Sequence, residues 1–238
     1  MTEQHHPNDY FSLEEMYLLL AATDGNVLFG FPGKEMFLLR DDDPMAFAHQ
    51  QLIAKEILTP EGAVTKSGAF VINKLSAYHQ SKKYVRCNNI MFSFQEENKE
   101  EVVLIIEAEK NKYYRLLVLS KAHALKVLYD GFPIVSREPA EDEKTFLTAE
   151  LSNQEKNEIK AMELSDPVFN LEVFHLDNYP ADITEPSFYQ NWLLFLYGDK
   201  LITLDIARQQ YQQVSQYWFM KQLFDEMEFP YKEVAQHG

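Results

Sequence analysis

The sequence predicts an α+β fold: a central antiparallel sheet built by two pseudo-repeated β-β-β-α halves and flanked by helices. Three strand-like runs precede a helix-like run in the order Asn88–Gln95, Val102–Glu109, Lys112–Leu119 and Ser120–Asp130. The order recurs later, with strands at Val168–Leu176, Trp192–Tyr197 and Leu201–Leu204 before a long helix at Asp205–Glu228. The run Val102–Ile106 is continuously apolar and rich in β-branched residues, which is typical of a strand buried on both faces.

The N-terminal part of the chain is predicted to be mainly helical. Ser12 and Glu15 match a capping box, in which the two side chains accept hydrogen bonds from free amides of the first helical turn. This motif predicts a helix that follows Ser12. A short strand is expected at Glu35–Leu39. Two further helices are expected at Met45–Ile57 and Thr65–His79.

An acidic triplet, Asp41–Asp43, stands directly before Pro44. Carboxylates stabilise the positive end of a helix dipole and proline suits the first helical turn, so the triplet predicts a helix start. Divalent-metal binding is the alternative. A calcium loop alternates its oxygen ligands and ends in a glutamate, and this spacing is missing. We therefore expect the triplet to cap a helix.

The 238 residues are predicted to form a single compact domain, 1–238, with pseudo-repeat halves at about 1–135 and 145–238. The segment Gly131–Lys144 is predicted to link the halves, because it contains two prolines and a cluster of charges. A helix is expected within Leu147–Leu164, where Ser152 and Glu155 form a second capping-box match.

The composition indicates a folded and acidic protein, with 46% hydrophobic residues and a formal net charge of -15 at pH 7. Nucleic acid and anionic membrane surfaces attract an excess of lysine and arginine, so neither is an expected partner. The N-terminal residues lack the basic and apolar regions of a signal peptide. No apolar run approaches the roughly 20 residues of a membrane span. We expect a cytoplasmic protein.

No group of residues predicts catalysis. Cys87 is the only cysteine, which excludes an intramolecular disulfide, and we expect its side chain to be packed rather than nucleophilic. The seven histidines show no metal-binding spacing, and neither a nucleophile elbow nor a glycine-rich phosphate loop occurs. Glu107 and Glu109 alternate out of a strand and are expected to face solvent. The sequence therefore predicts a protein that is not an enzyme and holds no cofactor or metal.

The chain resembles the EspG-like cytoplasmic chaperones of bacterial type VII (ESAT-6-type) secretion, including the EsaE-like accessory proteins. Three features carry the resemblance: the opening Ser12–Leu20, the segment Ile57–Thr65 with its following helix, and the doubled β-β-β-α order. The resemblance implies a quasi-twofold fold. It also implies that a sheet loop and helices near the C-terminal end recognise the exposed tip of a helical-hairpin substrate. The matching positions are Gln95–Glu101 and Asp205–Glu228.

We therefore expect a protein-binding surface with an acidic loop and aromatic anchors. Its candidate residues are Glu96, Glu97, Glu100, Glu101, Tyr211, Tyr217, Trp218 and Met220. Neighbours on a helix lie about 100° apart, so the large side chains of the last predicted helix cannot share one face, and some must approach solvent or a partner. Core packing is the alternative for the aromatic residues, and a solvated hairpin end is the alternative for the glutamates.

The expected function is that of an adaptor or chaperone that binds a helical type VII secretion substrate before export. The alternative is an immunity protein that neutralises a secreted toxin by direct binding, because an acidic surface would suit a basic nuclease. Self-association is left open by the sequence.

Overall fold

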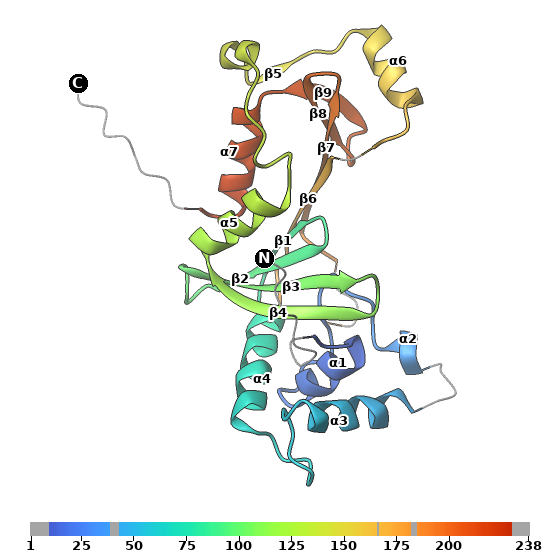
Figure 1. Ribbon diagram of the computed structural model, residues 1–238, viewed down its shortest axis with the longest axis vertical. Coiled ribbons are helices and arrows are strands. Elements are labelled where there is room, and N and C mark those ends of the chain that lie inside the picture. Colours follow the sequence, from blue (N-terminus) through green and yellow to red (C-terminus); the bar gives the residue numbers. More distant parts are fainter. Residues whose placement is uncertain (1–9, 39–42, 166, 182–184, 230–238) are drawn as a thin grey trace, which may run out of the picture. The chain divides into compact units, whose positions relative to one another are not determined.

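The computed structural model describes residues 10–38, 43–165, 167–181 and 185–229, which contain seven α-helices and nine strands (Figure 1). The predicted α+β class, with antiparallel strands and flanking helices, is confirmed. The chain divides into two compact units, each made of two stretches of sequence. The first unit comprises Met1–Leu119 and Phe174–Phe188, and the second comprises Ser120–Val173 and Tyr189–Gly238. The single compact domain stays a prediction.

The first unit combines four helices with four strands. The helices are α1 (Leu13–Ala21), α2 (Glu35–Leu38), α3 (Pro44–Ala54) and α4 (Lys66–His79). The strands lie in the order β4-β3-β2-β1, with β1 at Lys83–Cys87, β2 at Ile90–Phe94, β3 at Glu101–Glu109 and β4 at Tyr113–Ser120. β2 pairs antiparallel with β1 and β3, so that Phe92 lies opposite Val85 and Leu104.

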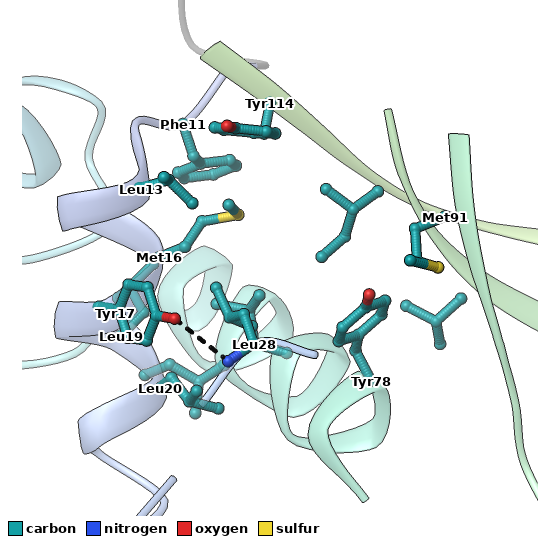
Figure 2. Packing of buried hydrophobic residues seen from close by; sticks show 14 of the residues in the cluster. Phe11, Leu13, Met16, Tyr17, Leu19, Leu20, Leu28, Tyr78, Met91 and Tyr114 are labelled. Atoms are coloured by element: carbon teal, nitrogen blue, oxygen red, sulfur yellow. Dashed lines mark hydrogen bonds between the residues drawn. The ribbon is translucent and has the colours of Figure 1, made fainter. Parts of the chain in front are cut away.

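The core of the first unit lies between these helices and one face of its strands (Figure 2). Met16 and Leu20 of α1 are fully buried and belong to the same cluster as Leu75 of α4. Tyr84 of β1 and Ile105 of β3 supply the sheet side of the cluster. Removal of these apolar side chains from water stabilises the unit, at roughly 1.5–3 kcal/mol for each fully buried large side chain.

Two buried tyrosines attach the loop after α1 to this core. The hydroxyl of Tyr17 accepts a hydrogen bond from the backbone N of Leu28, at 3.4 Å (Figure 2). The hydroxyl of Tyr78 donates to the backbone O of Phe29, at 2.7 Å. Buried backbone groups of an irregular segment need such partners, so these hydroxyls hold the loop in place.

The predicted helix starts of the first unit are confirmed. In α1 the backbone N of Glu15 donates to Ser12 Oγ, and the backbone N of Ser12 donates to the Glu15 carboxylate, so both halves of the capping box form. Asp43 accepts a hydrogen bond from the backbone N of Ala46 and caps α3. Asp41 and Asp42 lie outside the described residues. The strand expected at Glu35–Leu39 is wrong, because residues 35–38 form the helical turn α2.

The second unit contains three helices and the remaining strands. The helices are α5 (Lys121–Gly131), α6 (Asn153–Ala161) and α7 (Gln216–Glu226). The strands lie in the order β6-β7-β8-β9-β5, with β5 at Thr148–Ala149, β6 at Val168–His175, β7 at Phe188–Tyr197, β8 at Lys200–Asp205 and β9 at Gln210–Val214. The last two residues of β6 and the first of β7 belong to the first unit.

Helices α7 and α6 cover opposite faces of the strands of the second unit (Figure 1). Phe219 of α7 contacts Phe169 of β6, with 5.4 Å between the ring centroids. Val168, the preceding residue, packs against the cluster that contains Ile159 of α6. Successive side chains of a strand point to opposite faces, so Phe169 faces α7 and Val168 faces α6.

In each half, four consecutive strands precede the helix, rather than three. β1 to β4 precede α5, and β6 to β9 precede α7. The helix predicted to start at Asp205 is wrong in its first part, since Asp205 ends β8 and its carboxylate accepts a hydrogen bond from Arg208 N in the following turn. Ser215 caps α7 instead. The glutamine-rich run Gln209–Gln213 lacks the β-branched composition that marks a strand, which hid β9.

The predicted linker Gly131–Lys144 is packed within the second unit rather than free. Ile134 and Val135 are buried, and their carbonyl oxygens accept hydrogen bonds from the Gln216 side chain at 2.9 and 3.2 Å. The capping box at Ser152 is confirmed, but the helix it opens is shorter than predicted, because residues 148–149 form β5.

Over the described ranges, none of the helices combines the length and the apolar character required to cross a bilayer.

Candidate functional site: an exposed hollow beside α7

The four candidate glutamates lie together in the first unit, in the turn between β2 and β3. Glu96, Glu97 and Glu100 are exposed, as is Glu101 at the start of β3. Lys82 lies 3.7 Å from Glu96 and also covers the ring of Tyr179. Exposed ion pairs of this kind contribute little to stability. The turn therefore presents several carboxylates that a basic partner could contact.

The four candidate residues of the C-terminal region belong to the second unit and do not share one surface. Tyr211 lies on β9, and it packs with Leu193 against the cluster beneath α6. Trp218 of α7 meets the edge of Trp192, with 6.4 Å between the ring centroids. Trp192 and Leu193 are neighbours on β7 and point to opposite faces. Tyr211 and Trp218 are therefore on opposite sides of the strands, and the expectation that one helix carries both is wrong.

Helix α7 divides its large side chains between the core and solvent. Phe219 and Leu223 are fully buried, and Phe219 packs against Phe169 of β6. Trp218 and Met220 are half-buried. Tyr217 is 50% exposed, so half of this large ring is available to a partner.

Tyr217 lies at an open hollow of about 450 Å³. The other lining residues come from the segment just before β5: Glu143, Lys144, Thr145, Phe146 and Leu147. Leu147 is 56% exposed. An exposed aliphatic side chain and an exposed aromatic ring thus stand beside a concave surface with charged residues at one side. Sequence reasoning selected Tyr217 but missed Leu147, although the apolar pair Phe146-Leu147, one residue after the charged run Glu141–Lys144, was a visible signal.

A buried polar network fixes the start of α7 beside this hollow. The Glu143 carboxylate accepts a hydrogen bond from the backbone N of Gln216 at 2.6 Å and from Arg137 Nη1 at 3.2 Å. Arg137 Nη2 donates to the other carboxylate oxygen and to the carbonyl oxygen of Asp199. A carboxylate at a helix N-terminus opposes the positive end of the helix dipole. The network therefore positions the first turn of α7, which carries Tyr217.

The same network determines the ionisation of Glu143. Burial acts to raise the pKa of this carboxyl, but the hydrogen bonds from Arg137 and Gln216 N act in the opposite direction and prevail. The pKa of Glu143 is consequently lower than its ordinary value, and the side chain carries a full negative charge at neutral pH.

In the described part of the chain, no three His, Cys, Asp or Glu side chains are grouped closely enough to hold a metal ion. Cys87 is fully buried, and burial raises the pKa of its thiol, so the prediction of a packed cysteine is confirmed.

The geometry defines an α+β protein with an exposed hollow beside helix α7, whose first turn is bonded to a buried carboxylate. The chain belongs to the family described as a domain of unknown function, DUF5081, whose model matches residues 5–235. It is similar to the type VII secretion system protein EsaE of Staphylococcus aureus strain USA300 and to that of strain NCTC 8325 / PS 47. Each is 24% identical over 204 residues, which cover 84% of this chain and 86% of the relative. The expected EsaE-like resemblance is thus confirmed as a distant similarity.

Proposed function

We propose that this protein is a cytoplasmic adaptor of a type VII secretion system that binds a helical substrate before export. The similarity to EsaE over most of both chains supports a role in that system. In this proposal the protein binds a partner and catalyses no reaction.

The observation that carries the proposal is the exposure of Tyr217 and Leu147 beside the hollow at α7. Large aromatic side chains surrounded by polar residues are typical anchors of protein interfaces. An apolar side chain of the substrate would enter the hollow and displace water from both residues. The exposed Lys144 would contribute to the polar rim of the contact.

The proposal is tested by affinity purification of the full chain from its native host, under conditions in which the secretion locus is expressed. We expect a helical secretion substrate to copurify with the unaltered protein and to be lost with Tyr217→Ala. Tyr129→Ala is the matched control, because Tyr129 lies on α5 of the same unit and is 48% exposed. Recovery of no secretion substrate by the unaltered protein contradicts the proposal.

The alternative function, neutralisation of a secreted toxin, gives a different result on co-expression. An immunity protein abolishes the activity of the bound toxin and protects the cell. An adaptor changes the solubility and export of its substrate and leaves the activity of a purified substrate intact.

A further inference from the structure

The strands of the second unit carry a second surface, on the face opposite α7. Helix α6 covers only one end of this face. Its buried Ile159 packs with Phe195 and Ile202, its Glu158 bonds to the hydroxyl of Tyr197, and its Glu155 accepts from Lys200 Nζ at 2.5 Å. All four strand residues lie close to the turn that joins β7 to β8.

We call the other end of this face the β7–β9 face. The side chains that form its floor are mainly apolar. Its floor consists of Leu193, Leu204 and Tyr211, which pack against the cluster that contains Ile159 but stay half-buried. They lie side by side because Leu204 is opposite both Leu193 and Tyr211. A strand rises about 3.3 Å per residue, so Asn191 lies roughly 20 Å along β7 from Tyr197. An α-helix with its side chains is about 10–12 Å wide, so the length of strand beyond α6 accommodates a second helix.

A polar and acidic group borders this floor. Glu172 Oε1 accepts hydrogen bonds from the Tyr189 hydroxyl at 3.0 Å and from Asn191 Nδ2 at 3.2 Å. Asn191 is 8% exposed, and its Oδ1 atom is buried with no hydrogen-bond partner among the described residues. A buried acceptor without a donor is costly, and a donor brought by a ligand would relieve that cost. Tyr189 is exposed and offers an aromatic ring to a cation.

We propose that the β7–β9 face binds a basic amphipathic helix of the secretion substrate, packed beside α6. Apolar side chains of that helix would cover Leu193, Leu204 and Tyr211, and a lysine or arginine would approach Glu172 and donate to Asn191 Oδ1. The charge of the face favours this choice over an acidic helix, because the Glu172 carboxylate borders its floor. This inference rests on the proposed function, since it identifies a second contact and the chemistry of the same partner.

The test is photo-crosslinking of the full chain in its native host with the secretion locus expressed. The photoreactive residue p-benzoylphenylalanine replaces Tyr211 in one variant and Tyr217 in another. The inference is supported if the Tyr211 variant crosslinks to a helical substrate segment that carries lysine or arginine. Crosslinking at Tyr217 alone overturns the inference and leaves the proposed function intact. Absence of a substrate crosslink from both variants overturns both. A Tyr211 crosslink to a second copy of this chain or to an acidic segment also overturns the inference.

Charge variants test the proposed chemistry on the substrate recovered in that experiment. Glu172→Gln keeps an oxygen that can accept from Tyr189 and Asn191 but removes the charge, and Glu172→Lys reverses it. We expect Glu172→Lys to raise the Kd about tenfold and Glu172→Gln to raise it less. The exposed Glu138 of the same unit provides the control, and Glu138→Lys should leave the Kd within about twofold. If Glu172→Lys and Glu138→Lys raise the Kd equally, Glu172 makes no specific contact with the substrate.

Discussion

Glu143 and Gln216 are joined by a hydrogen bond of 2.6 Å from the backbone N of Gln216 to Oε2 of Glu143, although 73 positions separate them in the chain. Glu143 is only 2% exposed. Its second partner is Arg137, whose guanidinium is also largely buried. The three residues act as one unit that fixes the first turn of α7, and with it the position of Tyr217.

The first prediction is that Glu143→Gln lowers the free energy of unfolding by about 2–3 kcal/mol. The amide cannot compensate the Arg137 charge, so a buried cation is left without its counter-ion. Urea unfolding followed by tryptophan fluorescence measures the change, because Trp218 lies on α7. Glu138→Gln, at an exposed position, should change the free energy by less than about 0.5 kcal/mol. Equal stability of Glu143→Gln and the unaltered protein would refute this role of the network.

The same carboxylate gives the stability a dependence on pH. The pKa of Glu143 is lowered by folding, so its contribution is present above the ordinary value of a glutamate and is lost as the pH falls through the lower folded-state value. Between pH 6 and pH 3, the free energy of unfolding should therefore fall more steeply for the unaltered protein than for Glu143→Gln. Parallel curves for the two proteins would show that Glu143 is not responsible.

The second prediction concerns the buried pair of Lys55 and Glu15 in the first unit. Lys55 Nζ lies 2.6 and 2.7 Å from the two carboxylate oxygens of Glu15 and also donates to Tyr10 O. Lys55→Met leaves a buried carboxylate without its cation, and we expect a loss of about 3 kcal/mol in thermal or urea unfolding.

Two further variants decide whether the loss comes from the charge pair. Glu15→Gln combined with Lys55→Met should recover part of the stability, since the amide can still cap α1 and no buried charge remains. Lys112→Met, which breaks the exposed pair with Glu109, should cost less than about 0.5 kcal/mol. A double variant as unstable as Lys55→Met would contradict the argument.

The third prediction concerns the turn between β2 and β3. Replacement of Glu96, Glu97, Glu100 and Glu101 by lysine should weaken binding of the recovered substrate at least about tenfold without unfolding the protein, because all four side chains are exposed. Calorimetry measures the binding, and circular dichroism measures the fold.

A control with the same change in net charge separates a local contact from long-range attraction. In the control variant, four exposed acidic residues of the second unit are replaced instead: Asp130, Glu138, Glu150 and Glu163. Their replacement by lysine should affect binding much less. If both sets weaken binding equally, the acidic turn is not a contact and only the overall charge matters.

The sequence by itself determined the features that depend on short-range interactions. The capping boxes at Ser12 and Ser152 form as predicted, because each joins residues only three positions apart. Residues 102–105 of the apolar run are buried as expected, because both faces of the strand are covered there, and Ile106 is half-buried. The family resemblance also followed from the order of such elements along the chain.

Only the tertiary structure decided how distant residues meet. Tyr211 and Trp218 are seven positions apart, yet a strand and a helix carry them to opposite faces of the same strands. A shift of one residue in the register of a strand moves every side chain to the opposite face of the sheet. The polar composition around Tyr211 does not specify that register, so the sequence did not determine which face Tyr211 occupies. Glu143 and Gln216 are paired although 73 positions separate them, and the hollow beside Tyr217 is lined by the same two regions of the chain. No local sequence pattern encodes such a contact, because it forms only when distant segments pack together.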